Sequence, residues 1–186
     1  HSAGRAGELT RMGIMGMLRE AFLEVRTQHV SETFAHQMIK RVLDHKMPLR
    51  VHAHRADDIL SAIRFAEEFD LDLRIEHCTE GHLVAKEMEQ LPIEKVTVGP
   101  TFTRKSKIEL KNKTWETYRI LHEHGLEISI TTDHPYTPVQ YLNLCAGLAA
   151  REGLPVDVAL RAITIHPARS LGVDDHVGSI ETGKDA

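Results

Sequence analysis

The chain has 186 residues, of which 41% are hydrophobic and 27% are charged, and its formal net charge is −4. A chain of this size and composition can bury the core of one soluble domain. Its charge balance offers no basic surface for nucleic acid or anionic lipid, so we expect a small-molecule substrate and neither nucleic acid nor membrane as partners. Cys78 and Cys145 form neither a CxxC motif nor a disulfide framework, which favours a reducing, cytoplasmic compartment.

The N-terminal part of the sequence predicts two helices. Apolar residues recur at helical spacing over residues 10–28, and this methionine-rich helix is expected to pack against the core or a partner. A second helix is predicted over residues 31–45, with Ser31 and Thr33 as alternative N-caps.

Four strand-and-helix units follow. Strands are predicted over residues 49–53, 71–76, 95–98 and 127–131, and helices over residues 57–69, 80–90, 114–124, 139–151 and 155–165. Strand spacings of about 20 to 35 residues are typical of parallel βα units. The pattern predicts an α/β fold with parallel strands. Four units could form half of a (β/α)8 barrel, which takes about 250 residues, or a small open sheet that is complete by itself.

Three of the predicted strands end in residues that can hold a metal ion. His52 and His54 lie at the end of the first strand, His77 follows the second, and Asp133 and His134 follow the fourth. Because the carboxyl ends of parallel strands lie at one face, these side chains can converge on one ion. Imidazole and carboxylate groups suit zinc and related divalent ions. The sequence therefore predicts a metal site at this face.

The segments VHAHRADDILSAIRFAEE, IEHCTEGH and ITTDHP, with the tail ALRAITIHPARSLGVDDHVGSIETGKDA, together resemble the amidohydrolase superfamily. The resemblance is strongest to its imidazolonepropionase-like and prolidase-like branch. It implies a partial (β/α)8 TIM barrel in which the four strands correspond to strands five to eight of the family barrel. It also implies that residues 1–186 are one domain, the C-terminal portion of a metal-dependent hydrolase, and that residues 176–186 begin the return to a β-sandwich domain.

The resemblance implies roles for the strand-end residues. His52 and His77 become metal ligands, with His77 alternatively polarising the substrate, and Asp133 becomes both ligand and general base. The cofactor would be a divalent metal, with zinc preferred and one or two ions in the intact enzyme. Such an ion makes hydroxide available near neutral pH, and a carboxylate beside it can pass the proton to a leaving nitrogen.

Three further residues are candidates for substrate contact, namely His54, His134 and Arg55. Alternation along the strand points His54 to the same side as His52. Each has a structural alternative: His54 could be a hydrogen-bonded structural residue, His134 could cap the loop before Pro135, and Arg55 could form a solvent-facing salt bridge with Asp57 or Asp58.

One family feature is missing, because no His-x-His pair precedes His52 in a strand. We therefore expect the isolated chain to bind metal weakly or not at all and to be inactive. We also expect self-association or pairing with a missing half-barrel, because open sheet edges would otherwise face water. The predicted activity is hydrolysis of a C–N bond in a cyclic amide or peptide-like substrate. The alternative is a non-catalytic half-barrel or assembly module, and a phosphotriester or lactone would use the same ion.

The positively charged segment over residues 101–107, with Lys111 and Lys113 beyond it, follows the third strand. It could bind a carboxylate or phosphate of the substrate, or it could be a solvated basic loop. The remaining histidines are expected at the surface or in helices; they include His82, His122, His124 and His166.

Overall fold

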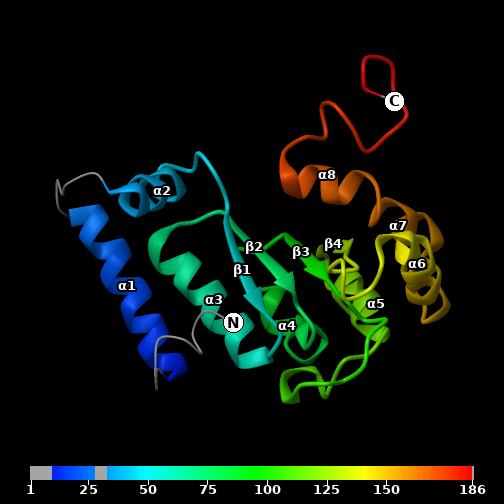
Figure 1. Cartoon of the computed structure of the whole chain (residues 1–186), viewed down its shortest axis with the longest axis horizontal. Coiled ribbons are helices and arrows are strands. Elements are labelled where there is room, and N and C mark those ends of the chain that lie inside the picture. Colours follow the sequence, from blue (N-terminus) through cyan, green and yellow to red (C-terminus); the bar gives the residue numbers. More distant parts are fainter. Residues whose placement is uncertain (1–9, 28–32, 186) are drawn as a thin grey trace.

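The computed structural model describes residues 10–27 and 33–185. The elements in chain order are α1 (Arg11–Thr27), α2 (Phe34–Leu43), β1 (Leu49–Ala53), α3 (Ala56–Phe69), β2 (Leu73–His77), η2 (Gly81–Leu83), α4 (Ala85–Met88), β3 (Lys95–Val98), η3 (Ile108–Leu110), α5 (Glu116–Glu123), β4 (Glu127–Ile130), η4 (Val139–Tyr141), α6 (Leu142–Arg151), α7 (Val156–Arg161) and α8 (Ile165–Leu171) (Figure 1). Among the described residues, no helix combines the length and the hydropathy needed to cross a membrane.

The four strands form one parallel sheet in the order β1-β2-β3-β4. Leu49 pairs with Leu73, and the register continues to Ala53 and His77 at the ends of the first two strands. Each strand lies beside the next one in the chain, whereas in a doubly wound sheet the strand order reverses at one point. The observed order is therefore that of a barrel segment. This confirms the predicted α/β class and the partial barrel.

The helix α3 packs along β1 and β2 with a buried face that includes Ile59, Ile63 and Phe65. Its C-cap is Asp70, which has a left-handed backbone with φ 56°. The N–H of Leu71 then closes the helix by donating to the carbonyl of Ala66. The second strand therefore begins at Leu73 and not at Leu71 as predicted.

Two other predicted helices are shorter than expected. The stretch predicted as one helix over residues 80–90 is the 3-10 turn η2 followed by the single turn α4. The helix predicted over residues 155–165 ends at Arg161, and α8 begins at Ile165 because the backbone of Thr164 leaves the helical region. At α2, Thr33 is the N-cap, since its side chain accepts from the N–H of His36. Ser31 and Gln28, named in the predictions, lie outside the described residues.

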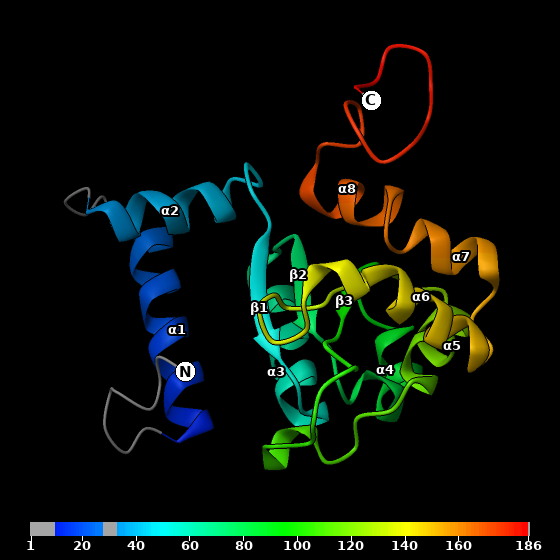
Figure 2. The same ribbon diagram turned by 45° about the vertical axis from the view of Figure 1, so that its right-hand side comes forward.

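The helices α1 and α2 stand beside the β1 edge of the sheet, and α6 to α8 gather at the β4 end (Figures 1 and 2). Phe22 anchors α1, with its ring edge-on to Phe65 at 5.0 Å and to Phe69 at 5.3 Å. Met12 on the same helix is 84% exposed. The helix therefore packs against the core as expected, but through Phe22, and Met12 takes no part in this packing.

The last helix contacts both edge strands. Arg50 of β1 donates to the carbonyl of Ser170, and Arg169 forms an ion pair with Glu127 of β4 at 3.0 Å. His166 of α8 is buried and donates from Nδ1 to the carbonyl of Ile128. These contacts lie toward the amino ends of the strands, so α8 ties the two edges together at the end of the sheet opposite the predicted site.

The sheet face away from α3 is polar along its first two strands. Arg50 and His52 are exposed, and Arg50 forms an ion pair with Glu76 on β2. The apolar residues Leu73 and Ile75 of β2 are buried on the helix side instead, as strand alternation requires.

Candidate metal centre

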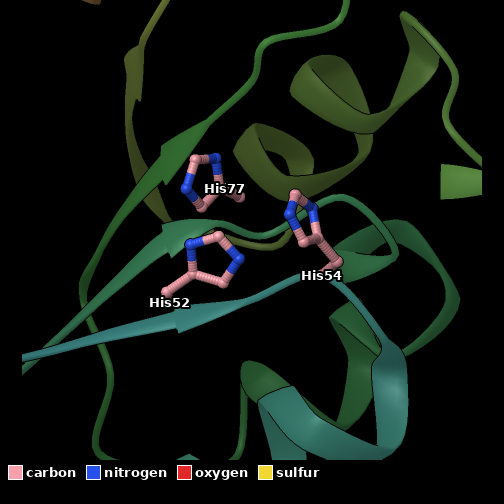
Figure 3. A group of neighbouring side chains, drawn as sticks. All are labelled: His52, His54 and His77. Carbon is pink, nitrogen blue, oxygen red and sulfur yellow. The ribbon is translucent and has the colours of Figure 1, made fainter. Parts of the chain in front are cut away.

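Three imidazole rings meet at the carboxyl ends of β1 and β2. The ring centroids lie 4.1 Å apart for His52 and His77, and 4.7 Å apart for His54 and each of the other two. One ligand nitrogen from each ring lies within 4.8 Å of the others. Figure 3 shows the three rings close together. His52 lies in β1, His54 directly follows this strand, and His77 is the last residue of β2.

The position of His77 depends on a local break in strand geometry. Regular alternation along β2 would send His77 to the buried side with Leu73 and Ile75. Instead, His77 has φ 75° and Cys78 has φ 41°, both in the left-handed region. Such conformations cost about 1 to 3 kcal/mol each and persist where the surroundings enforce them. This backbone turn brings the ring of His77 against His52.

Hydrogen bonds leave one ring nitrogen of His77 free for a ligand. Its Nδ1 lies 2.7 Å from the carbonyl oxygen of Gly99, which can only accept, so Nδ1 carries the hydrogen. In the neutral ring Nε2 then carries the lone pair. His54 has a similar contact, because its Nδ1 lies 2.7 Å from Oγ1 of Thr79. A metal-binding imidazole is commonly held through its other nitrogen in this way.

Burial favours the neutral forms of two of the three rings. It lowers the pKa of His54 to about 4, and the neighbouring His77 and His52 add to this effect. Partial desolvation also lowers the pKa of His52, with a further contribution from His77. Neutral imidazole is the form that binds metals. Imidazole nitrogens are common zinc ligands, so the three side chains present fit a divalent ion in their chemistry.

The other predicted ligand, Asp133, is not one of the three grouped side chains. Asp133 follows β4, two strands away from β2, and it is half-buried with φ 50°. Its N–H donates to Oγ1 of Thr131, and its carbonyl accepts from Tyr136. Within the described part of the chain, the ligand group that forms contains the three histidines and does not include Asp133. Its role as ligand and general base stays a prediction, as does substrate contact by the exposed His134.

Arg55 adopts the alternative that the sequence left open. Its Nε and Nη2 donate to the carboxylate of Asp57 at 2.9 and 2.8 Å. Arg55 also directly precedes α3, at the mouth of the β1 strand. Substrate contact by this residue stays a prediction.

Sequence reasoning missed two carboxylates near the cluster. Glu80 is 6% exposed, and its oxygens accept from the N–H of Ala56 at 2.9 Å and from Nδ2 of Asn112 at 2.8 Å. Glu109, in η3, has Oε1 4.0 Å from Nε2 of His54. Glu80 could have been found from the sequence, because it lies three residues after His77. Glu109 was overlooked because it lies in a segment that was considered only for its positive charges.

The basic segment is only partly solvated. Arg104, Lys105 and Lys107 are exposed, but Lys113 is buried and its Nζ donates to the carbonyl and hydroxyl oxygens of Thr103, each at 2.6 Å. Burial lowers the pKa of Lys113. Lys113 therefore stabilises this loop through hydrogen bonds. For this residue, the alternative of a solvated basic loop is wrong.

Comparison with known proteins identifies the family. The profile of the Amidohydrolase family matches residues 14–186, so the chain belongs to the amidohydrolase family. The resemblance found in the sequence motifs, including its imidazolonepropionase-like branch, is confirmed.

Individual relatives agree with this assignment. The chain is 40% identical to an amidohydrolase from Thermotoga maritima MSB8, with a TM-score of 0.87 over 95% of this chain and 49% of that one. It is 40% identical over 68 residues to an imidazolonepropionase from Cupriavidus necator, which covers 35% of this chain and 16% of that protein. A Xaa-Pro dipeptidase with bound methionine, at 23% identity and a TM-score of 0.56, shares the fold. The chain thus spans about half of the solved T. maritima chain.

Proposed function

We propose that this protein is a metal-dependent hydrolase that cleaves a C–N bond in a cyclic amide or peptide-like substrate. The observation that carries the proposal is the group of three imidazoles at the carboxyl ends of β1 and β2, with Nε2 of His77 left for a ligand because Nδ1 bonds to Gly99. In a barrel of this family's kind, the carboxyl ends of the strands are where chemistry takes place. Family membership supports the hydrolase class.

In this proposal His52 and His77 bind a divalent ion, with zinc preferred, and Asp133 completes the ligand set. When bound, such an ion makes hydroxide available from water at neutral pH. Asp133 accepts the proton of the attacking water and delivers it to the leaving nitrogen. His54, His134 and Arg55 contact the substrate around the reacting bond. The left-handed backbone of Asp133 supports a special role, because strain of this kind gathers at functional positions.

We further propose that a second half-barrel completes the site. The T. maritima chain, of which this chain spans 49%, supports that arrangement. The β1 edge is the natural place for pairing, because an unpaired strand edge offers free N–H and carbonyl groups. The two buried free cysteines fit the cytoplasmic location expected from the sequence.

The test is metal analysis and hydrolysis assays on the intact protein, with a panel of dipeptides and cyclic amides. We expect bound divalent metal, activity on at least one member of the panel, and a loss of about 10²- to 10⁴-fold in kcat for Asp133→Asn. Asp175→Asn, at an exposed position near the C-terminus, is the matched control and should retain activity. Full activity in Asp133→Asn would remove that residue from proton transfer, and metal binding without hydrolysis of any panel member would favour the non-catalytic module.

A further inference from the structure

We propose that Glu80 and Asn112 form a clamp that positions the loop between β3 and α5 for substrate binding. The clamp is the hydrogen bond that Nδ2 of Asn112 donates to Oε1 of Glu80 at 2.8 Å. Both are positioning residues, because they act on the substrate through the loop and through His54. The inference deepens the proposed function and rests on it, since it concerns substrate binding at the same site.

The first observation is that the carboxylate of Glu80 joins two segments. Its Oε2 accepts from the N–H of Ala56 at 2.9 Å, while Oε1 accepts from Asn112. Ala56 is the first residue of α3, and the N-cap residue Arg55 makes no side-chain capping bond. A helix leaves its first N–H groups without partners inside the helix. Glu80 therefore caps α3 from another segment, and this bond fixes its carboxylate so that the second oxygen can hold Asn112.

The second observation is that the same segment holds His54, which contacts the substrate in the proposed function. The N–H of Glu80 donates to the carbonyl of His54 at 2.8 Å, and Oγ1 of Thr79 lies 2.7 Å from Nδ1 of the ring. Two consecutive residues thus fix both the backbone and the ring of His54. Because one of them is Glu80, the histidine and the loop are held by the same residue.

The third observation is the place of the loop beside the site. Asn112 lies just after η3, and η3 carries Glu109, whose Oε1 lies 4.0 Å from Nε2 of His54. A groove of about 1180 Å³ opens there, and its lining includes His52, His54, Lys107 and Glu109. The side chain of Glu109 is 30% exposed, so it borders the groove. A substrate that reaches His54 through the groove therefore lies against this loop.

The fourth observation separates the shape of the loop from its position. Nζ of Lys113 donates to the carbonyl and hydroxyl oxygens of Thr103, each at 2.6 Å. This contact lies within the loop, so it preserves the shape of the loop when the clamp is removed. The clamp instead joins the loop to Glu80, and a hydrogen bond to a carboxylate is stronger than one between neutral groups. Loss of the clamp therefore shifts the loop without unfolding it.

The experiment compares KM and kcat among variants of the intact protein, with a substrate found in the panel. We expect Asn112→Ala to raise KM by about 10-fold and to leave kcat within about twofold, because the loop moves while the reacting groups stay in place. Asn112→Asp should raise KM further, because it sets a second carboxylate against Glu80. The matched control is Asn143→Ala, which removes an exposed side chain that accepts from the N–H of Leu144, and KM should stay within about twofold.

A reciprocal exchange tests the hydrogen bond itself. In the double variant Glu80→Gln with Asn112→Asp, the new amide at position 80 can donate to the new carboxylate at position 112. Its oxygen can still accept from the N–H of Ala56. We expect the double variant to return KM to within about threefold of the original, although Asn112→Asp alone raises it. A general loss of stability in each single variant would not produce this rescue.

The possible failures are distinguishable. If the unmodified protein hydrolyses a panel member and Asn112→Ala leaves KM unchanged, this inference is overturned while the proposed function stands. A double variant no better than Asn112→Asp would also overturn it, and so would an equal rise of KM in Asn112→Ala and Asn143→Ala. If the unmodified protein hydrolyses no panel member, the proposed function fails, and the role of the clamp in substrate binding fails with it. Circular dichroism checks that each variant remains folded.

Discussion

His77 and Gly99 are joined by two reciprocal hydrogen bonds. Nδ1 of His77 donates to the carbonyl oxygen of Gly99 at 2.7 Å, and the N–H of Gly99 donates back to the carbonyl of His77 at 3.2 Å. Gly99 has φ 128°, and a Cβ placed there would lie 2.3 Å from the carbonyl oxygen of Thr131. The ends of β2, β3 and β4 therefore meet at one glycine, and the orientation of a candidate metal ligand depends on that contact.

We expect Gly99→Ala to destabilise the fold by at least about 2 kcal/mol, because an alanine there combines a strained φ with a backbone clash. Urea denaturation measures the loss in the free energy of unfolding. Gly147→Ala is the control, because Gly147 lies in α6 with open space around its Cβ position, and helix propensity there favours alanine by up to about 1 kcal/mol. Equal stability of the two variants would contradict the role given to Gly99.

Thr79→Val should raise KM by up to about 10-fold, because it removes the partner that holds Nδ1 of His54, a proposed substrate contact. The chain offers a matched control in Thr117→Val, since Oγ1 of Thr117 makes the same kind of contact with Nδ1 of His82 at 2.9 Å, outside the cluster. Steady-state kinetics of both variants of the intact protein check the prediction. A similar rise in KM in both variants would mean that the effect is not specific to the site.

Glu80→Ala should lower the free energy of unfolding by about 2 to 4 kcal/mol, because two donors lose a buried charged acceptor. One of these donors is the N–H of Ala56 in the first turn of α3, where a negative charge also favours the helix dipole. Glu80→Gln should cost less, because its amide oxygen can still accept one of the bonds. Glu89→Ala, which removes an exposed carboxylate paired with His124, is the control and should cost under about 1 kcal/mol.

The stability of the metal-free protein should fall as the pH is lowered through the range set by His54. Its folded-state pKa is lowered to about 4 from a usual value of 6.5, so the unfolded chain binds the proton more readily between these values. The contribution of His54 is therefore complete above about pH 6.5 and is lost toward pH 4, with an upper limit of about 3 kcal/mol. Urea denaturation in chelator at several pH values measures it. His54→Gln should flatten this part of the profile, whereas His45→Gln at an exposed position should leave it unchanged.

Phe22→Ala should loosen α1 from the rest of the molecule, with a cost of about 3 kcal/mol from the lost burial and ring contacts. Met12→Ala on the same helix removes an exposed side chain and should cost under about 0.5 kcal/mol. Hydrogen exchange over residues 11–27 reports the local effect. Unchanged protection of α1 in Phe22→Ala would mean that other contacts hold this helix.

The strand-end motifs could be found from sequence because alternation and chain order are local properties. Leu49–Ala53 and Lys95–Val98 were predicted to the residue, and His52 and His77 were placed at one face by the rule for parallel strands. The prediction of one helix over residues 80–90 was wrong because part of this backbone forms hydrogen bonds with a distant segment. There, the N–H of Glu80 donates to the carbonyl of His54, a contact between residues 26 positions apart in the chain that no local pattern reveals.

By itself, the sequence determined the α/β class, the four parallel units, the family and the residue types at the strand ends, because these depend on periodicity and on motifs contiguous in the chain. Only the tertiary structure decided which of those residues meet. It joined His54 to His52 and His77, left Asp133 two strands beyond β2, and brought Glu109 beside the cluster. The physical reason is that the backbone turn at His77 and the path of the loop carrying Glu109 are set by contacts between distant segments, such as the bond to Gly99.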